Sequence, residues 1–181
     1  RWLFSKGYEV VGTRHKSELS APYPLVQCDL SKTLCLDETF DVIVHAAGSL
    51  PYNTSDIRDF KRNNIDSMVN VIDFAKRKGI SRIIYLSTIG VYGEFRDTNI
   101  NEDSDQINLD PYGLTKYIAE QLLQAESQIE GISLRMPGII GKGSRGVWLP
   151  NTVEKFRRNE VVKIYSPDFE TKNFVWVEDL V

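Results

Sequence analysis

The chain has 181 residues, which is enough for one α/β domain with a sizeable core. Its net charge of −3 argues against a nucleic-acid partner, because domains that bind nucleic acid usually carry a basic face. No apolar run approaches the roughly 20 residues that cross a bilayer, and no signal peptide is recognisable, so we expect no membrane partner and a cytoplasmic location.

The first residues have the pattern of the end of a helix. Arg1 to Phe4 continue a helical run, and Gly7 is typical of the residue that ends one. A dinucleotide-binding domain places a first strand and a glycine-rich loop before such a helix. We therefore expect the first strand and the glycine loop to be missing, upstream of Arg1, from what is a fragment of a longer protein.

Short apolar runs follow, separated by longer amphipathic stretches. Their β-branched content and lack of polar alternation are typical of parallel strands that are buried on both faces. The expected strands cover residues 8–13, 24–28, 40–45, 82–87 and 132–135.

Helices are expected between these strands. Apolar residues at spacings of three and four predict a helix from Ile57 to Lys78, which Gly79 ends. An N-cap aspartate and a proline at the first helical position, residues 110–111, predict a second helix to about Gln128, closed by Gly131. A last helix is expected over residues 149–158.

The alternation of strands and helices predicts a doubly wound α/β fold with a parallel, Rossmann-like sheet. Residues 1–140 are expected to form a dinucleotide-binding domain, incomplete at its N-terminal side. Residues 141–181 are expected to begin a smaller substrate-binding domain. The polar stretch 94–109 is expected to be a surface loop.

The strongest chemical signal is a tyrosine and a lysine four residues apart, Tyr112 and Lys116. Residues at this spacing share one face of a helix. A neighbouring ammonium favours the phenolate and would lower the pKa of the tyrosine, which could then exchange a proton with a substrate hydroxyl. Thr88 ends a predicted strand at the edge where α/β sheets bind ligands, so its hydroxyl could hold the same substrate oxygen.

The residues around this pair resemble the extended short-chain dehydrogenase/reductase family, which includes nucleotide-sugar epimerases, dehydratases and reductases. The segment LSTIGVYG at residues 86–93 and the Asp-Pro start of the helix carry the resemblance, which covers essentially the whole chain. It implies Thr88 as the catalytic hydroxyl, Tyr112 as the acid/base and Lys116 as a ligand of the nicotinamide ribose.

The resemblance also implies the cofactor site, with NADP as the expected cofactor and NAD as the alternative. Arg14 follows the second strand of the family, where no carboxylate precedes Glu18, so it is expected to pair with a 2′-phosphate. Asn64 is expected to order the active site, and no metal site is expected. The remaining expected cofactor contacts are Asp29, Leu30, Ala46, Ala47, Gly48, Ser87 and Pro137.

Several of these positions have simpler explanations. His45, beside the expected cofactor segment, is interpreted as a core histidine. Asp29 could instead be a helix cap or a turn residue. Arg14 could belong to a solvated basic turn, and residues 46–48 could be small only because the chain packs tightly there. Asn63 is adjacent to Asn64, and only the resemblance favours the second. Cys28 and Cys35 lack the spacing of metal ligands and are expected to be small packed thiols.

Three departures from the family narrow the expected reaction. Ile89 and Gly90 stand where sugar dehydratases carry an Asp-Glu pair, so elimination of water is disfavoured. Gly138 replaces a substrate-binding asparagine, and Lys172 replaces an arginine that grips phosphate. These changes weaken the assignment of any particular nucleotide sugar.

The expected function is an NAD(P)-dependent oxidoreductase or epimerase that transfers hydride at a carbinol carbon, in a small-molecule substrate such as a nucleotide-linked sugar. The alternatives are a non-catalytic cofactor-binding sensor or scaffold of the same fold, and a chain that is inactive as given. The resemblance implies a homodimer through the two long helices, with Phe60, Val71 and Phe74 as apolar residues beyond the core stripe.

Overall fold

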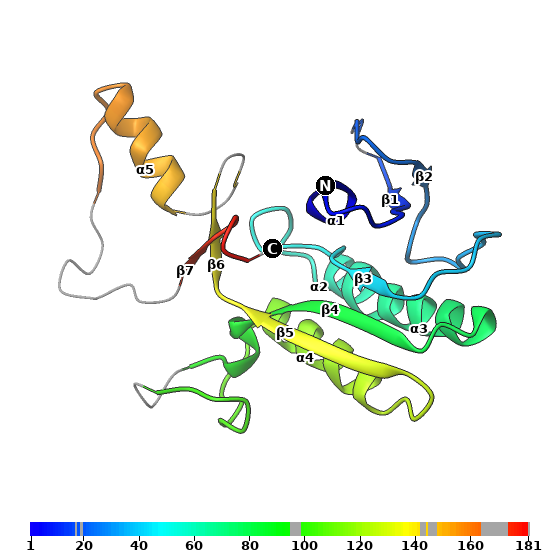
Figure 1. Ribbon diagram of the computed structural model, residues 1–181. Coiled ribbons are helices and arrows are strands. Elements are labelled where there is room, and N and C mark those ends of the chain that lie inside the picture. Colours follow the sequence, from blue (N-terminus) through cyan, green and yellow to red (C-terminus); the bar gives the residue numbers. More distant parts are fainter. Residues whose placement is uncertain are drawn as a thin grey trace. The chain divides into compact units, whose positions relative to one another are not determined.

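Figure 1 shows the computed structural model of the protein. It describes residues 1–16, 18, 20–94, 99–141, 144, 148–163 and 174–180. The chain divides into two compact units, Arg1–Arg135 and Met136–Val181, which are described separately. The functional division at residue 140 stays a prediction.

Two groups of strands build the first unit. β1 (Gly12–Arg14) pairs in parallel with β2 (Leu25–Gln27). β3 (Ile43–His45), β4 (Arg82–Thr88) and β5 (Glu130–Met136) form a second sheet in the order β3-β4-β5, in which β3 and β4 are parallel. All five expected strands are confirmed in type, but β1 and β3 begin later than the apolar runs that predicted them.

An apolar cavity of ≈ 440 Å³ separates the edges of β1 and β3. Residues of both strands line it, together with apolar side chains that include Leu34, Phe40 and Phe74. In a doubly wound sheet a further strand would take this place. That strand stays a prediction.

The helices of the first unit begin with α1 (Trp2–Ser5), after which Gly7 adopts a positive φ of 88°, as expected of a residue that ends a helix. The predicted helix over residues 57–78 is present but not uniform. It consists of α2 (Ile57–Phe60), a π-helical segment η1 (Lys61–Asp66) and α3 (Ser67–Lys78). Gly79 ends it with φ 68°, as predicted.

Helix α4 (Pro111–Gln124) begins as its sequence predicts. The Asp110 side chain accepts a hydrogen bond from Gly113 N at 2.6 Å, and Pro111 occupies the first turn. The expected end at Gln128 and the expected closing role of Gly131 are wrong. Gly131 lies in β5, where a Cβ atom would meet the Leu123 side chain, so this glycine permits close packing of strand on helix.

Helices α3 and α4 pack against each other over one face of the β3-β4-β5 sheet (Figure 1). Alternate residues of β4, namely Ile83, Tyr85 and Ser87, are buried on that face. The opposite face carries exposed apolar side chains such as Val44 at 46%. The expectation that these strands are buried on both faces is therefore wrong among the described residues, because helices cover only one face.

The apolar side chains of α2 and α3 serve the core. Phe60, Val71 and Phe74 are at most 4% exposed, and the latter two belong to the main core cluster. Our expectation that these three residues mark a dimer surface is wrong, because they cover the protein's own interior. Homodimerisation itself stays a prediction.

The second unit contains β6 (Gly138–Ile140), which pairs in parallel with β7 (Phe174–Trp176), and α5 (Trp148–Arg157). Gly138 is opposite Phe174 in this ladder. Lys172, expected to replace a phosphate-binding arginine, lies outside the described residues. No helix in the described parts of either unit is long and apolar enough to cross a membrane.

Candidate active site

The carboxyl end of β4 brings two of the predicted catalytic residues into contact. Thr88 is the last residue of this strand, and its hydroxyl accepts a hydrogen bond from Gly90 N at 3.1 Å. The Thr88 side chain also interacts with that of Tyr112 and lowers the pKa of its phenol. Residues 24 apart in the sequence are therefore brought near each other at the strand end.

A close approach of backbone to backbone makes this contact possible. Gly113, in the first turn of α4, faces the carbonyl of Gly90, and a Cβ atom at position 113 would overlap that oxygen. Because Gly113 carries no side chain, the helix start lies directly against the turn that follows Thr88. This glycine thereby permits the close approach of the first turn of α4 to the end of β4.

The pKa of Tyr112 is raised from its usual value, mainly because the side chain is buried, and the hydrogen bond with Thr88 opposes this only in part. Our expectation that Lys116 lowers this pKa is wrong for the geometry observed. The Lys116 ammonium donates to the carbonyl of Leu86 at 2.6 Å and lies 4.0 Å from the centroid of the Tyr85 ring. The phenol of Tyr112 is therefore protonated at neutral pH.

Lys116 is only 5% exposed. Burial lowers its pKa to about 8, and the nearby carboxylate of Glu120 opposes that shift. The cation–π contact with Tyr85 and the hydrogen bond to Leu86 O replace part of the hydration that the ammonium loses. Lys116 therefore keeps most of its charge at neutral pH and loses it a little above.

Asn64, which was expected to order the active site, is buried with 1% of its surface exposed. Its Oδ1 atom accepts from Ser49 N at 2.7 Å, and its Nδ2 atom donates to Thr115 Oγ1 at 3.0 Å. The alternative residue, Asn63, donates to Ser49 Oγ at 2.8 Å and does not reach α4 through a described contact. Of the two asparagines, Asn64 is therefore the one whose described contacts reach α4, and its ordering role stays a prediction.

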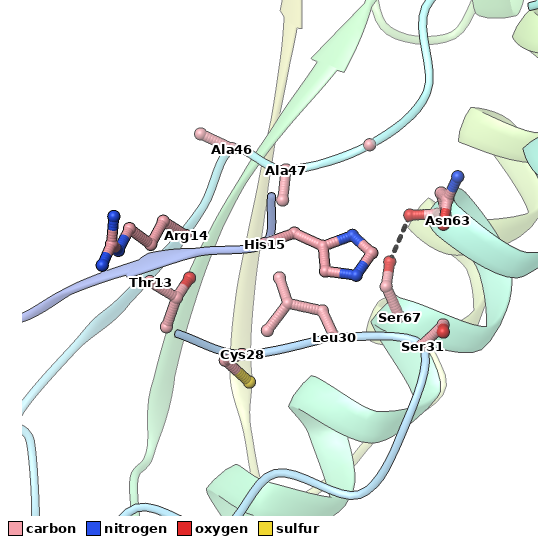
Figure 2. Close-up of a pocket in the computed structure, with 11 residues that line it drawn as sticks. Thr13, Arg14, His15, Cys28, Leu30, Ser31, Ala46, Ala47, Asn63 and Ser67 are labelled. Carbon is pink, nitrogen blue, oxygen red and sulfur yellow. Dashed lines mark hydrogen bonds between the residues drawn. The ribbon is translucent and has the colours of Figure 1, made fainter. Parts of the chain in front are cut away.

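A second cavity, of ≈ 320 Å³, lies at the carboxyl ends of β1 and β3. This volume is typical of small-molecule sites. Figure 2 shows that Arg14 and His15 leave the end of β1 in different directions, with the His15 ring directed toward Asn63 and Ser67. Five predicted cofactor residues line this cavity, namely Arg14, Leu30, Ala46, Ala47 and Gly48.

Asp29 does not belong to the lining of this cavity. Its carboxylate accepts hydrogen bonds from the Ser31 hydroxyl at 2.6 Å and from Ser31 N at 3.1 Å, and these bonds lower its pKa. His15 Nε2 lies 3.8 Å from the same carboxylate. The turn interpretation of Asp29 thus agrees with its contacts, and its expected role near an adenine stays a proposal.

The remaining predicted residues are placed as follows. Ser87 is 5% exposed, and its hydroxyl has no hydrogen-bond partner among the described residues. Pro137 belongs to the second unit. Sequence reasoning missed Thr13, His15, Cys28, Ser31, Asn63 and Ser67, which also line the cavity. The spacing of Asn63 and Ser67, four residues apart on one helix, was the available signal.

The interpretation of His45 as a core residue agrees with the structure. The side chain is 3% exposed and stacks on Tyr85, with the ring centroids 5.4 Å apart. Burial, together with the charge of Lys116, lowers its pKa to about 4. No group of three or more metal-binding side chains gathers around it or elsewhere in the described residues.

The buried imidazole predicts a loss of stability in acid. An unfolded chain binds a proton at His45 near pH ~6.5 and the folded protein only near pH 4, so stability falls as the pH drops between these values. The expected cost at pH 5 is about 2 kcal/mol relative to pH 7. Urea unfolding at both pH values measures it. A His45→Leu variant should lose less between the two pH values, and an equal loss would contradict the prediction.

Comparisons with known proteins bear on the whole chain. The profile of the NAD dependent epimerase/dehydratase family matches residues 1–181. The chain belongs to this family. A UDP-glucose 4-epimerase of Azospirillum brasilense is 25% identical over 92% of the chain and 54% of the relative. A decarboxylating sterol-4-alpha-carboxylate 3-dehydrogenase of Saccharomyces cerevisiae is 28% identical over 72% of the chain and 37% of the relative.

Solved structures of the family share the fold of this chain. A UDP-galactose 4-epimerase superposes with a TM-score of 0.85 at 22% identity, covering 98% of this chain and 63% of that one. A UDP-glucuronic acid 4-epimerase from Bacillus cereus, in complex with NAD, gives a TM-score of 0.84 at 23% identity over 98% and 64%. The chain thus spans between about half and two-thirds of the length of these 4-epimerases.

Proposed function

We propose that the protein is an NAD(P)-dependent oxidoreductase or epimerase that acts at a carbinol carbon of a nucleotide-linked sugar. The observation that carries the proposal is the placement of Thr88 at the carboxyl end of a parallel strand, in interaction with Tyr112, with Lys116 on the same helix as Tyr112. Two hydroxyl groups held together there can bind one substrate oxygen and move its proton.

We propose that the cavity at the carboxyl ends of β1 and β3 takes the adenosine part of a dinucleotide. The small residues Ala46, Ala47 and Gly48 line it, and Arg14 supplies a cation there. The unpartnered hydroxyl of Ser87 lies at the end of β4, next to Thr88. We propose these residues, with Leu30, Asp29 and Pro137, as the cofactor contacts, and we propose that Lys116 binds the nicotinamide ribose.

A bound nicotinamide would supply the acceptor or donor of the hydride of the carbinol C–H bond. Thr88 orients the substrate oxygen through its hydroxyl. Tyr112 donates its proton to that oxygen when a carbonyl becomes an alcohol, and takes the proton back in the reverse direction. Because burial keeps Tyr112 protonated, the observed geometry is ready for the first of these directions.

The substrate class is proposed from the relatives and from one absence in the active site. Several similar proteins are described as 4-epimerases of UDP-sugars. Ile89 and Gly90 offer no carboxylate after Thr88, so the described residues of this turn supply no acid and base for elimination of water. Epimerisation or reduction is therefore favoured over dehydration.

Nicotinamide fluorescence tests the proposal. Titration with NADH and NADPH should show saturable binding, and UDP-glucose, UDP-galactose and UDP-glucuronic acid should then be screened for a change in reduced cofactor or for the 4-epimer. Binding without turnover of any nucleotide sugar would favour the sensor or scaffold alternative. Absence of dinucleotide binding would overturn the proposal.

The preference for NADP(H) is proposed from Arg14, which lines the cavity at the end of β1. A charge-assisted contact with a 2′-phosphate contributes about 1.5–3 kcal/mol, so Arg14→Ala should weaken NADPH binding roughly 10- to 100-fold. NADH has no such phosphate, and its affinity should stay nearly constant. Parallel fluorescence titrations measure both constants. Tighter binding of NADH by the unaltered protein would contradict the preference.

A further inference from the structure

Segment 46–48, which lines the proposed dinucleotide cavity, is attached directly to Asn64. Ser49 follows the segment, and its backbone N–H donates to Asn64 Oδ1 at 2.7 Å. A Cβ atom at Gly48 would lie 2.7 Å from the same oxygen, so the backbone of the segment lies directly against the amide. A displacement of this segment is therefore transmitted to the Asn64 side chain.

The π-helical turn of η1 contributes a second attachment. Asn63 donates to Ser49 Oγ at 2.8 Å, so two consecutive asparagines bind one residue. Ser67 donates to Asn63 O at 2.5 Å, and both residues line the cavity. Wider turns of this kind inside helices are frequent at functional sites. Hydrogen bonds therefore join the segment over residues 46–49 to the helix over residues 57–78, and residues of both line the cavity.

Thr115 continues this network into α4. It is 2% exposed, its Oγ1 atom accepts from Asn64 Nδ2 at 3.0 Å, and its hydroxyl donates to Tyr112 O at 2.9 Å. The donor and acceptor of each of these hydrogen bonds follow from the bond between Ser49 N and Asn64 Oδ1. Because Oδ1 of Asn64 accepts a backbone N–H, Nδ2 must donate to Thr115, and the single hydroxyl proton remains for Tyr112 O.

We propose that Thr115 is a positioning residue that couples occupation of the dinucleotide cavity to the first turn of α4, which carries Tyr112 and Lys116. The inference rests on the proposed function, because it takes this cavity as the cofactor site. Ser49, Asn64, Thr115 and the Tyr112 carbonyl form one continuous chain of hydrogen bonds. A ligand that fixes residues 46–48 thereby also fixes the backbone of the catalytic tyrosine.

Hydrogen–deuterium exchange with adenosine diphosphate as the probe tests this coupling. The described residues that line the cavity come from β1, the segments after β2 and β3, and the helix over 57–78, and include none from α4. ADP lacks the nicotinamide, so protection of α4 must arrive through the protein. In the unaltered chain ADP should slow exchange about fivefold in peptides that cover residues 46–49 and 112–119.

Three variants separate coupling from binding. Thr115→Ser keeps the hydroxyl and should behave like the unaltered chain. Thr115→Val removes it and should lose the ADP-induced protection of residues 112–119 while keeping that of residues 46–49. Thr115→Ala, which places no second methyl group against the Asn64 amide, repeats the test if the valine variant does not fold.

The outcomes distinguish this inference from the proposed function. Equal ADP-induced protection of α4 in Thr115→Val and in Thr115→Ser would overturn the coupling while leaving the dinucleotide site in place. Protection of α4 without protection of residues 46–49 would also overturn it. Absence of protection at both segments in the unaltered chain would overturn the proposed dinucleotide site, and the coupling with it.

Discussion

Replacement of Tyr112 by phenylalanine is expected to abolish turnover while leaving dinucleotide binding nearly unchanged. The ring of Tyr112 packs against Phe60, with the centroids 6.0 Å apart, and phenylalanine retains this contact. Only the hydroxyl that interacts with Thr88 and carries the proton is lost. General acid–base groups contribute about 10²- to 10⁴-fold to rate, so kcat should fall by that factor.

Nicotinamide fluorescence and initial rates, measured on the same preparation, check both halves of this expectation. Lys116→Met is the contrasting variant. It removes the ammonium that donates to Leu86 O and should weaken dinucleotide binding as well as rate, because the proposed ribose contact is also lost. Residual activity of the Tyr112→Phe variant within a few-fold of the unaltered enzyme would remove Tyr112 from the mechanism.

The parts of the fold that the sequence predicted well are those with strong local signals. β4 is a run of β-branched and aromatic residues, and α4 starts with an aspartate cap and a proline, so both were located within a few residues. The end of α4 was misplaced because Gly131 is typical of a helix end. Its actual role depends on Leu123, a contact that no local pattern contains.

The candidate site likewise divides into features with local sequence signals and features that depend on tertiary contacts. Thr88, Tyr112 and Lys116 could be proposed because their spacing and the strand end are local features, and residues 46–48 because they resemble the corresponding segment of the family. The direction of the Lys116 ammonium, toward Leu86 O and the Tyr85 ring, depends on tertiary packing. The raised pKa of Tyr112 could not be derived for that reason. The π-helical turn was not predicted, and its Asn63 contacts Ser49, a residue distant in the sequence.

A large loss of stability is expected from Glu120→Ala. Glu120 is 4% exposed and accepts from Arg135 Nε at 3.1 Å and Nη2 at 2.9 Å. Arg135 also donates to Tyr92 Oη at 2.8 Å and to Glu102 O at 3.0 Å, which ties the polar loop to β5. Removing the carboxylate leaves a largely buried guanidinium without its counter-charge, and such losses cost about 3–5 kcal/mol.

A matched control is provided by Glu130, which lies on β5 like Arg135. Glu130 makes a similar two-bond pair with Arg82, with Nε at 2.8 Å and Nη2 at 2.6 Å. Both of these side chains are about half exposed, at 58% and 49%. Water solvates the charges before and after the change, so Glu130→Ala should cost about 1 kcal/mol or less. Urea unfolding of both variants measures the difference, and equal losses would contradict the importance of burial.

Substitution of Glu120 has a second consequence, in the active site. The Glu120 carboxylate opposes the effect of burial on Lys116, whose pKa is about 8. Without Glu120 that pKa falls further, so the ammonium is lost at lower pH. If turnover requires the charged lysine, the basic limb of the pH–rate profile lies near pH 8 in the unaltered enzyme. In Glu120→Gln, which keeps the shape of the side chain but removes its charge, this limb should move to lower pH. An unmoved limb would show that Glu120 acts on stability alone, because loss of packing lowers the whole profile without shifting its midpoint.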